Sequence, residues 1–134
     1  MSPLDRYVVS LLSQVPTVAD DDPVEWKPIR HHFGIEAFGV NAFVASGEGD
    51  PVIEHHDEVG PEHEELYVVI VGHALFRVGD EEIDAPAGAL VFVRDPSIRR
   101  VATAREAGTT VLAIGGKPGS AFKRSDWERR DLGG

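Results

Sequence analysis

The sequence predicts an all-β fold, a sandwich or barrel, with a short helix at the N-terminus. Three observations favour this class. From Ile29 onward, apolar runs of about five to eight residues alternate with turns rich in glycine, proline and acidic residues. No long helical pattern separates these runs, which argues against parallel βαβ units. The length of 134 residues suits one domain with one core.

The first residues predict the short helix. Ser2 and Pro3, with Asp5 three residues after Ser2, form a pattern typical of a helix start. Apolar residues then recur at helical spacing, at Leu4, Tyr7, Val8, Leu11, Leu12 and Val15. Pro16 ends this pattern. The acidic and proline-rich stretch 19–28 that follows is typical of a surface linker.

The apolar runs are the expected strands. They lie at residues 29–33, 35–45, 65–71, 74–78, 89–93, 99–104 and 109–114. Turn residues separate them at 47–51, 79–82, 86–88, 95–96 and 106–108. After residue 116 the chain becomes polar and basic. We therefore expect an N-terminal helix and linker at 1–28, a barrel at 29–116 and a C-terminal tail at 117–134.

The charge of the chain excludes two classes of partner. Thirteen basic and 23 acidic residues give a formal net charge of -10. Nucleic-acid backbones and anionic membranes attract basic surfaces, so neither is expected as a partner. The charge is uneven, because residues 94–134 carry nine basic and five acidic residues, whereas residues 1–93 carry four and eighteen.

The sequence contains no cysteine, which excludes disulfide bonds, zinc–thiolate sites and thiol nucleophiles. The N-terminal residues lack the pattern of a secretory signal, and no apolar run approaches the roughly 20 residues that span a bilayer. These features predict a soluble, cytoplasmic protein.

Residues 54–72 hold the densest group of chemically active side chains. Three histidines and six carboxylates precede or begin the apolar run that ends at Gly72. Side chains that bind metals or transfer protons therefore lie next to an expected buried strand. This arrangement predicts a pocket that opens into the interior of the barrel.

Two segments within residues 49–103 resemble the two motifs of the cupin family. Glu65, the six residues LYVVIV and Gly72 reproduce the second half of the first motif in register. The resemblance implies an antiparallel jelly-roll barrel with a site at its open end. It implies no single activity, because cupins range from dioxygenases, isomerases and lyases to storage and sugar-sensing proteins.

The opening of the first motif allows two alignments. Gly49 followed after five residues by His55 fits it, and His56 with Glu58 is an equally good ligand pair one residue later. The loop before Glu65 is longer than in the motif and includes a third histidine.

The second motif keeps its length but not its chemistry. Arg94, Pro96, Arg99 and Thr103 stand where the motif has proline, glycine, histidine and asparagine. The ligand histidine is therefore missing. Arginine stays protonated and offers only hydrogen-bond donors, so Arg99 cannot replace it as a metal ligand.

The candidate metal ligands are His56, Glu58, His63 and Glu65, with His55 as the alternative to His56. Mixed nitrogen and oxygen ligands suit a divalent transition metal such as iron, manganese, nickel, zinc or copper. The alternative is that these residues form a solvated acidic loop without a metal. Both interpretations stay open at this point.

Glu65 and Arg99 are the candidate catalytic residues. A carboxylate at the start of an apolar strand has to be paired, bound to a metal or raised in pKa. Strand alternation lets only one of Arg99 and Arg100 face inward, and the second motif places Arg99 across the pocket from Glu65. An inward arginine could pair with Glu65 or clamp an anionic ligand.

The resemblance implies a homodimer, because small cupins commonly pair through their sheets. The site residues predict a protein that binds, and in one version converts, a small polar or anionic metabolite inside the barrel. The alternative is a non-catalytic sensing or interaction module with a metal-free pocket. Whether the protein is an enzyme is left open.

Overall fold

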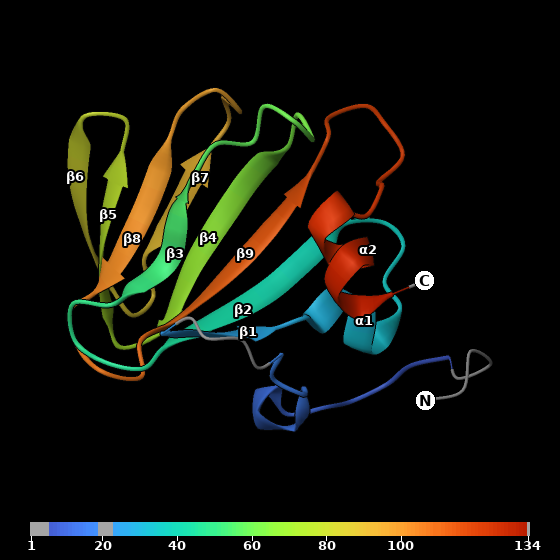
Figure 1. Cartoon of the computed structure of the whole chain (residues 1–134), viewed down its shortest axis with the longest axis horizontal. Coiled ribbons are helices and arrows are strands. Elements are labelled where there is room, and N and C mark those ends of the chain that lie inside the picture. The colour runs from blue at the N-terminus through green and yellow to red at the C-terminus, as the bar shows by residue number, and fades with distance from the viewer. Residues whose placement is uncertain (1–5, 19–22, 134) are drawn as a thin grey trace.

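The computed structural model describes residues 6–18 and 23–133. Two antiparallel sheets face each other (Figure 1). The first contains, in spatial order, β1 (Val24–Lys27), β2 (Gly39–Ala45), β9 (Thr110–Gly116), β4 (Glu64–Val71) and β7 (Leu90–Val93). The second contains β3 (Pro51–His56), β8 (Arg100–Ala104), β5 (His73–Val78) and β6 (Glu81–Pro86). Strands from both ends of the chain are neighbours in each sheet, which is the arrangement of a jelly roll.

Alternate side chains of the two sheets form the core. In β7, Val91 and Val93 are buried, whereas Leu90 and Phe92, which alternate with them, point outward and are exposed. The largest apolar members of the buried cluster are Val52, Ile53, Tyr67, Val69, Phe76, Val91, Val93 and Val111. Since these residues come from both sheets, the cluster fixes the sheets against each other.

Two helices lie together at one end of the sandwich, near the ends of β2 and β9 (Figure 1). They are α1 (Ile29–Phe33) and α2 (Asp126–Leu132). Ser125 caps α2, because its hydroxyl accepts a hydrogen bond from the backbone N–H of Glu128. Among the described residues, no helix has both the length and the apolar composition needed to cross a bilayer.

Five expected strands are confirmed, with ends shifted by no more than two residues: β4, β5, β7, β8 and β9. The run at 35–45 forms a strand only from Gly39, as β2. The structure adds β3 and β6, which begin with a proline and with two glutamates and therefore carry weak strand signals.

The expected strand at 29–33 is wrong, because these residues form α1. Gly34 ends the helix in a left-handed conformation, with φ of 71°. Pro28, with its fixed φ, immediately precedes the first helical residue. A proline before the segment and a glycine after it are the features of the sequence that indicate a helix here.

The interpretation of 19–28 as a surface linker is also wrong for its second half. Val24–Lys27 form β1, and Trp26 is buried and donates a hydrogen bond of 2.9 Å to the side-chain oxygen of Asn41. The expected helix start at Ser2–Asp5 lies outside the described residues, and from residue 6 to residue 18 the only helical element is a short 3-10 turn, Leu12–Gln14. Val15 of the periodic pattern is buried, but Tyr7, Val8 and Leu11 stay exposed, so these residues form no buried apolar face that would stabilise a longer helix.

Candidate functional site

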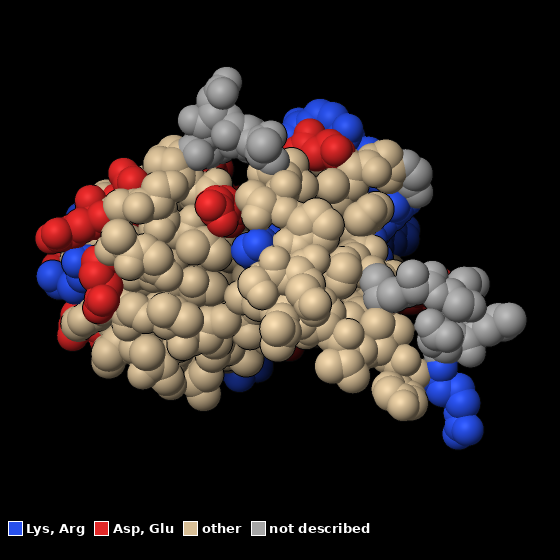
Figure 2. Space-filling view, turned by 90° about the horizontal axis from the view of Figure 1, so that it is seen from below, with Lys and Arg blue, Asp and Glu red and all other residues tan. Residues whose placement is uncertain are grey.

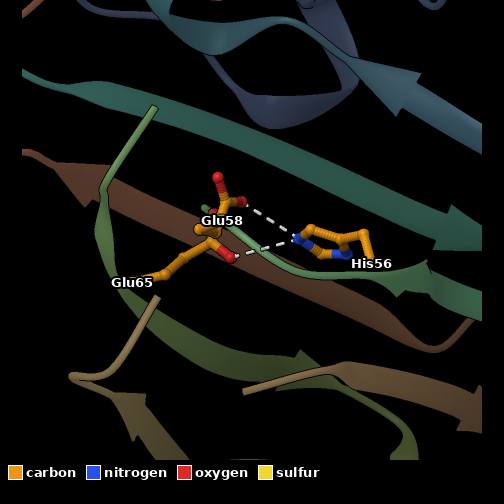
Figure 3. A group of neighbouring side chains, drawn as sticks. All are labelled: His56, Glu58 and Glu65. Carbon is orange, nitrogen blue, oxygen red and sulfur yellow. Dashed lines mark hydrogen bonds and ion pairs between the residues drawn. The ribbon is translucent and has the colours of Figure 1, made fainter. Parts of the chain in front are cut away.

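The fold brings side chains from three separate segments together inside the barrel mouth. His56 is the last residue of β3, Glu58 lies in the loop after it, and Glu65 lies near the start of β4 (Figure 3). Arg100 is the first residue of β8. Because β3 and β8 belong to one sheet and β4 to the other, the group bridges the two layers.

His56 connects the two carboxylates. Its Nε2 lies 3.0 Å from Glu58 Oε1 and 3.5 Å from Glu65 Oε1 (Figure 3). Its Nδ1 lies 2.7 Å from the backbone carbonyl oxygen of Glu54. Both ring nitrogens therefore face acceptors, which favours the doubly protonated, positively charged ring.

Glu65 Oε1 has two more partners. The Tyr67 hydroxyl donates a hydrogen bond to it, and Arg100 Nη1 lies 3.4 Å away. Backbone carbonyls fix the rest of the guanidinium, because Arg100 Nε donates to Ile98 over 2.9 Å and Nη2 to Asp95 over 3.2 Å. The arginine is thus held in one orientation, with Glu65 as its carboxylate partner.

The environment shifts the pKa values of these groups in different directions. Burial by itself would lower the pKa of His56, but its hydrogen bonds to Glu58 and Glu65 outweigh burial and raise the pKa to about 10. Burial raises the pKa of Glu58, and the negative charge of Glu65 acts in the same direction. Burial also opposes the charge on Glu65, yet hydrogen bonds from His56 and Tyr67 hold its pKa below the ordinary value.

The pKa values of two neighbouring carboxyl groups are therefore shifted in opposite directions. Such a separation of pKa values is the arrangement by which a site assigns one carboxyl group as acid and the other as base. Burial, followed by the negative charge of Glu65, raises the pKa of Tyr67, so this phenol remains a hydrogen-bond donor.

The prediction that Arg99 faces Glu65 is wrong. The Arg99 side chain is 62 % exposed, and its Nη2 lies 3.9 Å from Asp57 Oδ2. The side chain of Arg100 is 0 % exposed and takes the predicted position. The physical reason is the phase of the strand: β8 starts at Arg100, and a shift of one residue moves every side chain to the other face.

The structure shows which of the two histidines at the end of β3 faces the site. His56 points toward Glu58 and Glu65, whereas His55 is exposed. The pairing of β3 with β8 is irregular between Ile53 and His56. Because this irregularity changes the alternation, the sequence pattern left both alignments open.

His63 lies outside this group. Its ring packs against the ring of Phe122, with 5.8 Å between centroids. It does line a cavity that Glu58 and Glu65 also line. The structure therefore places His63 in the wall of the pocket, and the histidine beside the two carboxylates is His56.

The cavity has a volume of about 70 Å³. Part of its wall comes from the C-terminal segment, through Phe122, Ser125, Trp127 and Glu128. The sequence interpretation missed these residues as part of the site. The pattern of Ser125 followed three residues later by Glu128 is a helix-start signal, and it could have indicated α2.

The residues present match the donor chemistry of a divalent metal. His56, Glu58 and Glu65 each place one ligand atom within 4.8 Å of the other two, and they are the one such group among the described residues. One nitrogen and two oxygens suit first-row transition metals. Arg100 competes with a metal for Glu65, because it presents a fixed positive charge to the same carboxylate oxygen.

No protein-family model matches the chain, and no curated protein matches it in sequence. Solved structures do match in fold. KdgF from Halomonas sp. aligns with a TM-score of 0.69 and 13 % identity, over 87 % of this chain and 96 % of that chain. A predicted oxalate decarboxylase from Thermotoga maritima aligns with a TM-score of 0.65 and 15 % identity, over 82 % and 99 %. An RmlC-like cupin from Shewanella frigidimarina aligns with a TM-score of 0.63 and 14 % identity, over 88 % and 93 %.

These structures share the jelly-roll architecture, and the first cupin motif lies in this chain at the mouth of that barrel. The chain therefore has the cupin fold.

Proposed function

We propose that the protein binds a small polar molecule at the barrel mouth beside Glu58 and Glu65, and that Glu58 exchanges a proton with it. The observation that carries this proposal is that both carboxylates line one cavity while their pKa values are shifted in opposite directions. The partners of Glu65 keep it ionised, so its negative charge stays in the site while Glu58 exchanges a proton. Glu58, whose pKa burial raises, is the carboxyl group of the two that takes up a proton more readily.

The wall of the cavity favours a ligand that donates hydrogen bonds. The lining residues include three carboxylates, Glu58, Glu65 and Glu128, and no lysine or arginine. Arg100, which could have clamped an anion, is already bonded to Glu65 and to backbone carbonyls. We therefore favour a ligand with hydroxyl or amino groups over an anionic metabolite.

Thermal-shift screening tests this proposal. The panel contains small polyols, sugars and amines, with hydroxy acids and inorganic phosphate as the contrasting set. A ligand that binds only the folded state at about 100 times its Kd adds about 2.7 kcal/mol of stability, enough to raise the Tm by several degrees. Glu58→Gln should reduce this shift, whereas Glu81→Gln, in an exposed position on β6, should leave it unchanged. A ligand that stabilises Glu58→Gln as much as the unsubstituted protein would contradict the proposed site.

A metal-dependent version of this function is the second candidate. His56, Glu58 and Glu65 would hold the metal, and the ligand spacing given above favours it. A bound divalent metal would act as a Lewis acid toward an oxygen of the ligand. The candidate metals are iron, manganese, nickel, zinc and copper.

Elemental analysis of protein purified without a histidine tag distinguishes the two versions. A stoichiometric metal that is lost in both His56→Ala and Glu65→Ala supports the metal site. His55→Ala is the matched control, because His55 is exposed and adjacent to His56. If metal content is the same in all four proteins, the metal binds elsewhere.

The same group of residues also suits a non-catalytic sensing module with a metal-free pocket. Its charges compensate one another, since His56 and Arg100 face Glu58 and Glu65. A ligand that binds tightly but is recovered unchanged after long incubation would favour this alternative over an enzyme.

We further propose that two copies associate through the outer face of the five-stranded sheet. Leu90 and Phe92 are 67 % and 46 % exposed there, and Phe92 and Leu66 line a groove of about 310 Å³. Acidic side chains instead gather at the end of the molecule formed by the β5–β6 hairpin (Figure 2). Two acidic copies that pair through the sheet face keep these charges in solvent.

Light scattering coupled to size exclusion tests the dimer. Phe92→Lys should give the mass of one chain, whereas Glu82→Lys, an exposed position on β6, should keep the mass of two. A single-chain mass for the unsubstituted protein would contradict this proposal.

A further inference from the structure

The C-terminal segment, residues 117–133, lies across the mouth of the barrel. The Phe122 ring packs so closely over Gly39 that a Cβ atom at Gly39 would lie 3.1 Å from it. In α2, Trp127 packs edge-on against Trp26 of β1, with 4.7 Å between ring centroids. These contacts place the segment directly over the cavity that Glu58 and Glu65 line.

A buried ion pair fastens this segment to the rest of the protein. Arg30 Nε in α1 donates a hydrogen bond of 2.6 Å to Glu128 Oε1 in α2. The two side chains are 8 % and 5 % exposed. Arg30 Nη1 also donates a hydrogen bond of 2.7 Å to the carbonyl oxygen of Ile35, so a contact near α1 in the sequence holds the arginine in place. Loss of one partner from such a buried pair is strongly destabilising, so the pair is sensitive to substitution.

The space beneath this segment is too small for a metabolite. The cavity of about 70 Å³ is well below the range of roughly 300–1,000 Å³ typical of small-molecule sites. Its inner wall includes Phe122, Trp127 and Glu128. A metabolite would have room between this wall and the carboxylates Glu58 and Glu65 only if the wall moves.

We propose that residues 117–133 form a lid that completes the ligand site and is held shut by the Arg30–Glu128 ion pair. The assignment of Phe122, Trp127 and Glu128 as ligand-facing residues rests on the proposed function, whereas the opening of the lid does not. The part of the segment before Ser125 contains no helix or strand, and Gly119 adopts a positive φ of 68°, so this part can change direction without breaking a regular element. The same segment also carries an exposed ion pair, Lys117–Glu62, which serves as the control for the buried Arg30–Glu128 pair.

A single introduced cysteine measures the opening, because the chain has no cysteine of its own. Ala113→Cys places a thiol in the wall of the cavity. Its rate of labelling by a soluble disulfide reagent reports how often the lid opens. Adding Glu128→Gln, which leaves the charge of Arg30 unpaired, should increase this rate about tenfold or more. Adding Glu62→Gln, which breaks the exposed pair on the same segment, should leave the rate unchanged.

Equal labelling rates in the two double variants would overturn the lid proposal, provided that circular dichroism shows both variants to be folded. Hydrogen exchange of the unsubstituted protein provides a test that does not depend on a variant. Backbone amides of α2 should exchange faster than those of β4 and β9. Exchange of all three at the rate of global unfolding would also overturn the proposal. Both measurements are made without ligand, so a failed ligand screen would contradict the proposed function and leave the lid standing.

Discussion

Glu65 in β4 and Arg100 in β8 form an ion pair that joins the two sheets inside the barrel. Glu65 Oε1 lies 3.4 Å from Arg100 Nη1, and the arginine side chain is fully buried. The Arg100 charge is stabilised by Glu65 and by fixed hydrogen bonds, because water does not reach the guanidinium, whereas His56 and Tyr67 contribute most to keeping Glu65 ionised. The pair therefore holds the carboxylate of the site in position and makes the site part of the core.

Arg100→Met should destabilise the protein by about 3–5 kcal/mol, because it removes the buried cation beside Glu65 and leaves the carbonyl oxygens of Ile98 and Asp95 without their donor. Arg99→Met is the matched control next to it and should change the stability by less than about 0.5 kcal/mol, because Arg99 is exposed. The free energies of unfolding come from urea titration. If Arg99→Met costs more than Arg100→Met, the orientation of β8 is the reverse of the one described.

The contribution of His56 to stability should disappear at alkaline pH. Its pKa in the folded protein, about 10, lies above the ordinary value of 6.5. The contribution is therefore fully present below pH 6.5 and is lost as the pH rises toward about 10. The difference in urea midpoint between the unsubstituted protein and His56→Gln should narrow over this interval. A difference that stays constant across it would show that His56 is not charged in the folded state.

Tyr67→Phe should destabilise the protein by about 1.5–3 kcal/mol, because the Tyr67 hydroxyl donates to the ionised Glu65. The Glu65→Gln/Tyr67→Phe double variant tests the coupling, since the cost of removing the hydroxyl should be smaller when the carboxylate is neutral. Equal costs in the two backgrounds would mean that the hydrogen bond to Glu65 does not stabilise the fold.

Gly72→Ala tests why the first motif ends in glycine. Gly72 has φ of 79°, and a Cβ atom there would lie 2.9 Å from the Cα of Thr109. We expect destabilisation of about 1–3 kcal/mol from the steric clash, in addition to the backbone strain. Gly88→Ala measures the strain alone, because φ is 95° and no atom lies within 4 Å of the added Cβ. A smaller effect at Gly72 than at Gly88 would rule out the clash.

The sequence predicted the parts of the site that depend on local pattern. Glu65 and Gly72 frame an apolar strand, and the structure places both where the motif requires them. The prediction of Arg99 instead of Arg100 failed because alternation gives the period of a strand but not its phase. The turn before β8 sets this phase, and its geometry depends on contacts such as that of Ser97 with Asp95.

The C-terminal contribution to the site could not be predicted in the same way. The helix-start pattern at Ser125 indicates a helix but not the surface on which it packs. Trp26 and Arg30 supply that surface from about one hundred residues earlier in the chain, through contacts with Trp127 and Glu128. Such long-range pairs leave no periodic signal in one sequence.

Chemical-shift mapping by NMR is the most direct test of the ligand site. The strongest ligand from the thermal-shift panel is titrated into unsubstituted, ¹⁵N-labelled protein, and the backbone amides that shift are assigned. We expect the largest changes to cluster at Glu58, His63, Glu65 and Trp127, around one cavity. Changes confined to the outer sheet face around Phe92, or to the β5–β6 hairpin, would contradict this expectation.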